Sequence, residues 1–442
     1  MEVVVIGAGA AGLAAAETLC SANVKVRILE ARNRIGGRIE TVRDPDLPIP
    51  IELGAEFIHG RPDEIFEIAR ATSLRIAEVT AEHRHLQNGR LRERYDLLSK
   101  IDEIFERMSD PALPDETFAE FATRTAADPE VRAWATAYVE GFNAARADRI
   151  STRALVQEMQ ASDAIDGERS FRIAEGYDRV AQRLYERCTS QGAICQLNSV
   201  VSGVRWQRGR VEVAVQSSSG NSHASFSADR VVVTVPLGVL QAPENARGTI
   251  RFDPPLAGLR EALAHLQMGA AMRITFRFRN SFVKQRRQLF EPGFIHSGDQ
   301  GFPTWWTTLA AAAPGSAPIP ALTAWAGGPK AERLSGLGDE LVAGVAIDSL
   351  SRILAVKRDS IAPQVKRWYL HNWCRDPFAR GAYSYAGVGG LEARRTLAAP
   401  VEETLYFAGE ATETEGHPAT VHGAIASGRR AARQILGASL PE

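Results

Sequence analysis

The sequence predicts an α/β protein in which a doubly wound domain is interleaved with a second, α+β domain of mixed sheet and helices. A continuous apolar run from Val3 to Ile6 is typical of a strand covered on both faces. It leads into the glycine-rich segment 7–12, a helical stretch from Leu13 to Cys20 and a second apolar run from Val24 to Leu29. This β-α-β unit with short connections predicts the start of a dinucleotide-binding domain.

The rest of the chain supplies the other elements of both domains. A charged stretch from 62 to 161 has apolar residues at helical spacing, and prolines divide it into several helices. Strands are expected at 194–200, 211–215, 231–235, 273–278, 321–326 and 404–407, a loop at 311–320, and helices at 339–354 and 420–436. We expect the dinucleotide-binding domain to comprise 1–61, 172–240 and 390–442, and the substrate-binding domain 62–171 and 241–389.

Composition limits the possible partners and the compartment. The chain has 442 residues, more than one compact core accommodates. Its 52 Lys and Arg against 53 Asp and Glu give a net charge of −1, which predicts neither nucleic acid nor an anionic membrane as a partner. The four cysteines lack metal-ligand spacing, so we expect no metal site, reduced thiols and a cytoplasmic location. Oligomeric state is left open.

The glycines of the first turn form a phosphate-binding fingerprint. Gly7 permits the tight turn, Gly9 lets a pyrophosphate approach the backbone, and Gly12 allows the helix to pack closely on the strand. Unpaired N–H groups at the start of the helix, around Ala11, face the phosphates. Glu30 ends the second strand, where a carboxylate accepts hydrogen bonds from a ribose diol; this favours FAD or NAD over NADP.

A second glycine pair separates those two cofactors. The segment from Glu30 to Arg38 contains Gly36 and Gly37 followed by an arginine, which predicts a second anion-binding loop. NAD sites do not need this extension, whereas FAD-dependent oxidoreductases of the glutathione-reductase type carry it. The sequence therefore favours FAD.

Further segments resemble the flavin-containing amine oxidase family, and specifically its polyamine oxidase and lysine-specific histone demethylase branch. They occur in family order along nearly the whole chain, and they are Glu52-Leu53-Gly54-Ala55-Glu56-Phe57-Ile58-His59-Gly60, Thr234-Val235-Pro236-Leu237-Gly238-Val239-Leu240, the segment 373–385, Tyr406-Phe407-Ala408-Gly409-Glu410 and the segment 418–428.

The resemblance implies a set of residues around FAD. The adenosine and pyrophosphate positions are Glu30, Ala31, Arg32, Gly37, Arg38, Val201, Gly409 and Glu410. The flavin positions are Leu53, Gly54, Ala55, Glu56, Phe57, Trp373, Ala419, Thr420 and Val421. The helix after Pro418 is expected to point its positive end at the flavin pyrimidine edge. Ala382 stands where monoamine oxidases attach the flavin through a cysteine, so FAD is expected to be non-covalent.

The resemblance also implies a substrate side. Trp373 and Tyr383 match aromatic residues that line the flavin and attract an amine cation or pack its carbon chain. His59 matches a substrate-pocket histidine, and a structural histidine in a turn is an equal alternative. Trp305 and Trp306 are expected to belong mainly to the core.

Arg273 departs from the family pattern. Most members have a lysine here, hydrogen-bonded through water to flavin N5. Lysine can lose its proton when desolvated, whereas arginine stays charged and is bulkier. We expect this substitution to change proton handling and reoxidation.

Together these features predict oxidation of a C–N bond of a (poly)amine by hydride transfer to flavin N5. The imine would hydrolyse, and O2 would reoxidise the flavin to give hydrogen peroxide. The first alternative is an L-amino acid oxidase, which Glu56 argues against because it would repel a carboxylate. Further alternatives, suggested by Arg273, are a flavoprotein desaturase and a catalytically weak flavin-binding protein.

Overall fold

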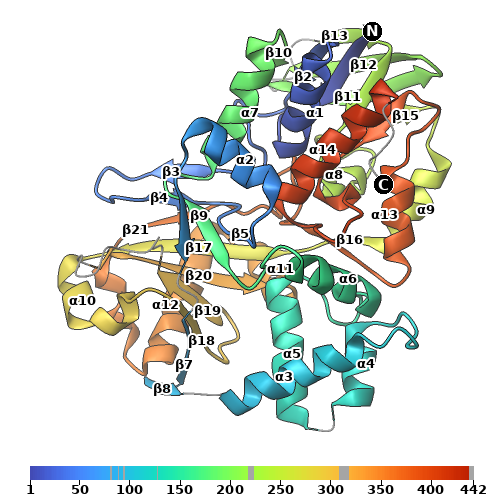
Figure 1. Ribbon diagram of the computed structural model, residues 1–442. Helices are drawn as coiled ribbons and strands as arrows, with labels where there is room; N and C mark the ends of the chain where they lie inside the picture. Colours follow the sequence, from blue (N-terminus) through green and yellow to red (C-terminus); the bar gives the residue numbers. More distant parts are fainter. Residues whose placement is uncertain are drawn as a thin grey trace.

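The computed structural model describes residues 1–79, 82–87, 89–92, 95–126, 128–217, 223–307 and 318–437. Its upper part in Figure 1 contains a five-stranded parallel sheet of order β10-β2-β1-β14-β23. The strands are β1 (Glu2–Ile6), β2 (Lys25–Leu29), β10 (Ile194–Gln196), β14 (Arg230–Val233) and β23 (Leu405–Phe407). The predicted β-α-β opening is confirmed, with helix α1 (Ala10–Ser21) between β1 and β2.

The parallel sheet is buried on both faces. Val3 and Val5 pack with α1, α7 (Asp178–Ser190) and α14 (Val421–Leu436). Val4 and Ile6 face the opposite core, shared with a four-stranded sheet of order β13-β12-β11-β15. Its strands are β11 (Ser199–Gln207), β12 (Arg210–Ser217), β13 (His223–Ala228) and β15 (Arg251–Asp253). The alternation explains why the strand reads as one apolar run.

The lower part in Figure 1 is built on a seven-stranded sheet of order β21-β17-β20-β19-β18-β7-β8. The strands are β7 (His83–Gln87), β8 (Arg90–Arg92), β17 (Ala271–Phe278), β18 (Phe294–His296), β19 (Thr304–Thr307), β20 (Ala321–Gly327) and β21 (Val365–Leu370). Helices α10 (Asn280–Gln285), α11 (Pro329–Ser335) and α12 (Asp339–Leu354) contribute to its core. A separate helical core contains α3 (Tyr95–Met108), α4 (Phe118–Thr125), α5 (Pro129–Phe142) and α6 (Thr152–Asp163).

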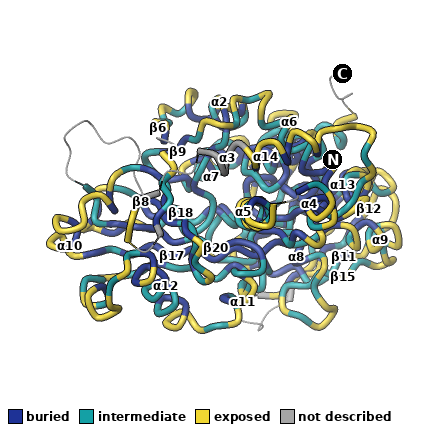
Figure 2. The backbone as a smooth tube through the Cα atoms, turned by 90° about the horizontal axis from the view of Figure 1, so that it is seen from below, coloured by how far each residue is buried: buried dark blue, intermediate teal, exposed yellow. Residues whose placement is uncertain are grey.

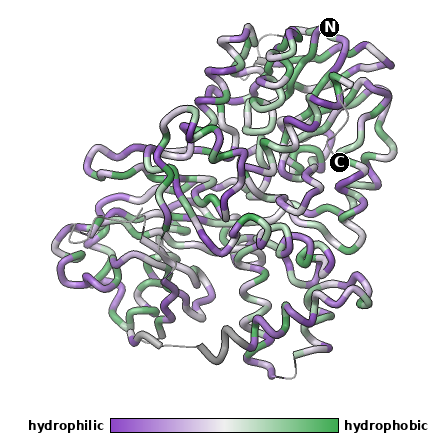
Figure 3. Tube along the Cα trace, in the orientation of Figure 1, coloured by the Kyte–Doolittle hydropathy of each residue, from purple (hydrophilic) through white to green (hydrophobic). Residues whose placement is uncertain are grey.

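Smaller elements pack on these sheets and their cores. They are α2 (Asp63–Thr72), α8 (Leu237–Leu240), α9 (Ala257–His265), α13 (Gly390–Ala398) and the small sheets of β3 (Thr41–Arg43) with β4 (Pro50–Glu52), of β5 (Ile58–His59), β9 (Ser170–Ile173) and β6 (Ile76–Val79), and of β16 (Leu266–Met268) with β22 (Ser384–Ala386). Buried residues follow the sheets through the interior, and exposed residues occupy peripheral loops (Figure 2). Hydrophobic stretches follow the same strands (Figure 3).

Two predicted elements are corrected. The strand expected at 194–200 is two strands, because Asn198 takes a left-handed backbone conformation (φ 56°) and sends the chain from β10 into a different sheet. The stretch 62–161 is not helical throughout, because β6, β7 and β8 lie within it; β6 pairs with β9, β7 with β18, and β8 forms a hairpin with β7. Most of the loop expected at 311–320 lies outside the described residues. Among the described helices, none is long and apolar enough to cross a bilayer.

Candidate active site

The first glycine turn has the shape that a pyrophosphate requires. Gly7 has φ +108°, and a Cβ on Gly12 would lie 2.0 Å from the Gly7 carbonyl oxygen, so both positions exclude side chains. A Cβ on Gly9 would meet no described atom within 4 Å. The first turn of α1, which is described throughout, has no acidic side chain and no side-chain cap. Its N–H groups and the open space above Gly9 therefore fit a phosphate.

The second glycine loop lies directly against the first, as the sequence predicts. Gly9 and Gly36 form an isolated β-bridge, and the Gly36 N–H donates to the Ala8 carbonyl at 2.8 Å. A Cβ on Gly37 would lie 3.4 Å from the Gly9 Cα. Two glycine loops that are separated in the sequence thus bring backbone amides together at one place, which suits a diphosphate.

Glu30, the residue expected at the adenosine ribose, lies beside this cradle and is 3% exposed. It accepts the Ala8 N–H at 2.8 Å and the Arg32 N–H at 2.9 Å, one on each oxygen. A carboxylate oxygen has a second lone pair, so both remain able to accept from a ribose hydroxyl. Ser199 donates its N–H to the Glu30 carbonyl at 2.8 Å, which brings β11 and Val201 to the same edge.

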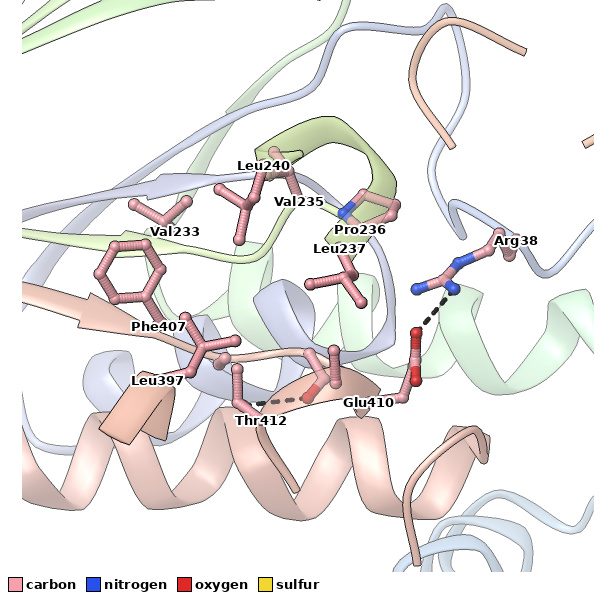
Figure 4. Close-up of a pocket in the computed structure, with 13 residues that line it drawn as sticks. Arg38, Val233, Val235, Pro236, Leu237, Leu240, Leu397, Phe407, Glu410 and Thr412 are labelled. Carbon is pink, nitrogen blue, oxygen red and sulfur yellow. Dashed lines mark hydrogen bonds and ion pairs between the residues drawn. The ribbon is translucent and has the colours of Figure 1, made fainter. Parts of the chain in front are cut away.

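Glu410 joins three segments that are distant in the sequence. It accepts Arg38 Nη1 at 2.8 Å, Ser384 Oγ at 2.6 Å and the Ala419 N–H at 3.2 Å. Figure 4 shows Arg38 and Glu410 pointing toward one another at the edge of a small, largely apolar pocket. Burial alone would raise the pKa of Glu410, but Arg38 and the Ser384 hydrogen bonds hold it below its usual value.

The start of α14 completes this side of the site. The Thr420 hydroxyl accepts the Gly423 N–H at 2.9 Å and donates to the His417 carbonyl at 2.7 Å, so it caps the helix. Ala419 has φ +61°. A Cβ on Gly428 would lie 2.1 Å from the Ala11 carbonyl, so the small residues of α14 also serve close packing against α1. Both roles expected for this helix are thus compatible. The described residues fit FAD.

Two aromatic residues expected on the substrate side are fixed through their polar atoms. Trp373 donates Nε1–H to the Leu53 carbonyl at 2.8 Å. A Cβ on Gly54 would lie 3.2 Å from Trp373 Cζ2, so the ring packs on the Leu53–Gly54 turn. Tyr383 donates its hydroxyl to the Phe142 carbonyl at 2.6 Å, and burial raises its pKa.

His59 lies among neutral groups. Its ring meets the Phe142 ring edge-on, with the two ring centroids 5.5 Å apart, and its Nδ1 atom lies 3.4 Å from Ser170 Oγ. Burial lowers the pKa of His59 to about 4, so it is neutral at physiological pH. Trp305 and Trp306 are both buried, as expected, and the ring centroids of Trp306 and Phe57 are 5.7 Å apart.

Glu56 and two arginines form a group of three buried charged residues. We call Glu56, Arg172 and Arg273 the arginine cluster; they are 6%, 7% and 6% exposed. Arg273 Nη2 lies 2.5 Å from Glu56, and Arg172 pairs with its other oxygen. Trp306 Nε1 lies 3.2 Å from Glu56 Oε2. Arg273 also donates to the Gly54 carbonyl at 3.2 Å, so the cluster lies against the same turn as Trp373.

The arginine cluster removes the basis for one sequence argument. Glu56 was expected to act as a negative charge that repels a carboxylate, but two guanidinium groups pair with it, and the three residues carry a net charge of +1. Arg172, which makes the net charge of the cluster positive, was not predicted. The strand Ser170–Ile173 offers a weak signal, because Arg172 is the one charged residue between two apolar residues that β9 buries.

Comparison with known proteins places this site in a family. The model of the flavin containing amine oxidoreductases matches residues 10–436. Polyamine oxidase 4 of Oryza sativa subsp. japonica is 29% identical, with 98% of this chain and 88% of the relative aligned. A lysine-specific histone demethylase 1 homologue of Arabidopsis thaliana is 30% identical over 98% of this chain and 58% of its own length.

The fold comparison agrees. A putrescine oxidase solved with bound putrescine superposes with a TM-score of 0.80, covering 99% of both chains at 21% identity. A cyclohexylamine oxidase from Brevibacterium oxydans IH-35A gives a TM-score of 0.78 at 20% identity, covering 99% of this chain and 98% of its own. The chain therefore belongs to the flavin-containing amine oxidoreductase family and is an FAD-dependent oxidoreductase.

Proposed function

We propose that this protein oxidises the C–N bond of an amine. The observation that carries the proposal is the position of Glu410, which ties Arg38 from the phosphate side to Ser384 beside Tyr383 and to the start of α14. These contacts support one continuous site that includes the segments assigned to FAD and to substrate. The FAD-binding part comprises 1–61, 172–240 and 390–442, and FAD binds without a covalent bond because Ala382 offers no nucleophile.

Bound FAD supplies the acceptor for the hydride that leaves the amine α-carbon, and O2 then takes the two electrons as hydrogen peroxide. The chain's own residues orient the substrate and exclude water. Trp373 and Tyr383 present aromatic faces, and neutral His59 adds a polar group without a charge. The N-terminus of α14 supports negative charge on the reduced cofactor. The imine product hydrolyses in water.

The substrate class has two candidates. The names of relatives, polyamine oxidase and putrescine oxidase, support a polyamine. The arginine cluster favours an amine that also carries a carboxylate, because Arg172 and Arg273 outnumber Glu56. Arg172 Nε is buried without a hydrogen-bond partner among the described residues, so it has a donor to offer an anion.

The test is anaerobic reduction of the holoprotein's flavin by spermine, spermidine, their acetylated forms, putrescine, aromatic monoamines and L-amino acids. Bleaching by one class establishes amine oxidation and names the substrate. If amino acids bleach the flavin, Arg172→Met should raise their KM at least tenfold and leave simple amines unchanged. A flavin that dithionite reduces, but that no member of the panel reduces, would refute the proposal and favour desaturation or a binding role.

The cofactor site has its own test in Gly9→Ala. Gly9 has an ordinary φ of −76° and open space at its Cβ position, so the apoprotein should keep its stability. The added methyl group should block the pyrophosphate and weaken FAD binding at least tenfold, measured by titration of apoprotein with FAD. Gly258→Ala, in α9 with equally open space, is the matched control and should bind FAD as the wild type does. Unchanged affinity of Gly9→Ala would contradict the site.

A further inference from the structure

A chain of alternating charges runs beside the expected FAD site, from its adenosine end to Trp373. Its first half joins Glu30 to Arg32 at 3.8 Å, and Arg32 Nη2 to Asp376 at 2.7 Å. Its second half continues from Asp376 through His371 to Glu40 and ends at Arg34, 2.9 Å from Glu40. We call this set the histidine network, made of Glu30, Arg32, Asp376, His371, Glu40 and Arg34.

The geometry of His371 fixes its protonation. Nε2 lies 3.0 Å from Asp376 Oδ2, and Nδ1 lies 3.1 Å from Glu40 Oε2. An ionised carboxylate only accepts hydrogen bonds, and a neutral imidazole has only one N–H to donate. Both contacts are therefore hydrogen bonds when His371 is an imidazolium. With that charge the network holds three cations and three anions, and without it one carboxylate is left in excess.

The imidazolium lies against Trp373. The two ring centroids are 3.9 Å apart at an interplanar angle of 32°, and the Arg34 guanidinium is 6.0 Å from the Trp373 ring centroid. A cation close to the face of an indole is attracted by the ring quadrupole. The Trp373 N–H is meanwhile held by the Leu53 carbonyl. His371 thus fixes the face of the ring, and the Leu53–Gly54 turn fixes its edge.

We propose that His371 is a positioning residue that, as an imidazolium held by Glu40 and Asp376, keeps Trp373 on the Leu53–Gly54 turn and links it to Arg32 at the adenosine end of the FAD site. The proposal rests on the proposed function in one respect, the placement of Trp373 beside the flavin. It assigns His371 no contact with substrate or cofactor.

The proposal makes FAD binding depend on pH. Burial alone would lower the pKa of His371, but hydrogen bonds to Asp376 and Glu40 and their negative charges raise it above its usual value. Arg34 and Arg32 also face the network. Burial would raise the pKa of Asp376 and of Glu40, yet His371 and the arginines lower both, so they stay ionised while His371 is charged. A raised histidine pKa means that the held arrangement is complete at low pH and is lost as pH rises through that pKa.

The first experiment measures the imidazolium in apoprotein, without any cofactor. NMR of protein labelled at histidine Cε1 should show one resonance, absent in His371→Gln, whose pKa lies above the ordinary histidine value because Asp376 and Glu40 stabilise the charged form. The fluorescence of Trp373, isolated as the difference between the wild type and Trp373→Phe, should change over the same pH range. Titration of the His371 resonance at or below 6.5 would overturn the proposal.

The second experiment measures FAD affinity of apoprotein between pH 6 and 9. The wild type should lose affinity as His371 deprotonates. His371→Gln, which is neutral at every pH, should bind about tenfold more weakly at pH 6 and show no such slope. His371→Arg can pair with both carboxylates and should keep wild-type affinity across the range. His265→Gln, at an exposed histidine that contacts the Val388 carbonyl, is the matched control and should follow the wild type.

The outcomes separate this inference from the proposed function. Wild-type affinity and pH slope in His371→Gln would refute the positioning role, whatever the enzyme's substrate. If the resonance titrates as expected but Trp373→Phe leaves the bound flavin's absorption spectrum unchanged, Trp373 is not beside the flavin, and that part of the proposed function fails. A flat pH profile in His371→Arg with retained affinity supports the role of the charge over that of the ring.

Discussion

The arginine cluster and the histidine network meet the same turn from two sides and handle buried charge differently. Arg273 of the arginine cluster donates to the Gly54 carbonyl, and Trp373, which lies against His371 of the histidine network, donates to the Leu53 carbonyl. The arginine cluster has an odd number of charged groups and keeps a surplus cation. The histidine network has a titratable sixth member that balances its charge. Effects of the histidine network should thus change with pH as His371 titrates, whereas the arginine cluster contains no histidine.

The largest expected effect comes from Glu56→Gln. It removes the carboxylate that pairs with both Arg172 and Arg273 and leaves these two buried cations side by side, and breaking a buried ion pair in this way costs about 3–5 kcal/mol. Urea denaturation should show this as a lower midpoint with an unchanged slope. Glu403→Gln, which breaks an exposed pair with Arg208, should leave the midpoint where it is. Equal midpoints for the two variants would remove the distinction between buried and exposed pairs.

A smaller effect, and one that depends on pH, comes from Glu52 beside the arginine cluster. Burial raises its pKa to about 7, against hydrogen bonds from Thr41 and the Tyr177 N–H. Between the ordinary pKa of a glutamate and about pH 7, Glu52 is protonated in the folded state and ionised in the unfolded state. Its contribution to the stability of the folded state therefore falls as pH rises through this range. The stability of Glu52→Gln relative to wild type should therefore increase by on the order of 2 kcal/mol between pH 4 and 8. A constant difference over this range would show that Glu52 ionises normally.

The smallest effect is expected for Arg172→Met, which removes the surplus cation and leaves the Glu56–Arg273 pair intact. Its cost should be about 1 kcal/mol, because the pair that remains is neutral and the new side chain fills the space against Phe57. In the Glu56→Gln background the same change should be stabilising, since it removes one of two repelling cations. A double-mutant cycle measures the coupling, expected at about 2 kcal/mol. Additive effects would mean that the two residues do not interact.

Short sequence patterns predicted those elements of the fold whose structure depends mainly on neighbouring residues. The β-α-β unit, the glycine turn and helix 339–354 follow from apolar runs, backbone sterics and helical spacing. Strand β7 was missed because His83 to Gln87 has no apolar alternation, and its pairing with β18 supplies the structure instead. The division at Asn198 depends on which sheet each half joins, which no short pattern records.

Site residues that lie in a sequence motif could be predicted. Charged residues that come together from separate elements of the fold could not. Glu30 and Arg38 lie in segments whose glycines identify them. Arg172 and His371 lie in no motif, and each acquires its role from partners that are distant in the sequence, Glu56 for one and Glu40 for the other. Even the interpretation of Glu56 changed, because a carboxylate considered alone would repel an anion, whereas this one is paired with two arginines in a cluster of net positive charge.

Gly54 sets a limit on how this site can be redesigned or can diverge. A Cβ there would lie 1.8 Å from the Arg38 carbonyl oxygen and 3.2 Å from Trp373, so no side chain fits. The turn is therefore a fixed reference point, and its two carbonyls offer no means of tuning specificity. New specificities are expected instead from the side chains that contact Glu56 just after the turn, Arg172 of β9, Arg273 of β17 and Trp306 of β19. Libraries directed at those three positions would explore new substrates while leaving the FAD cradle intact.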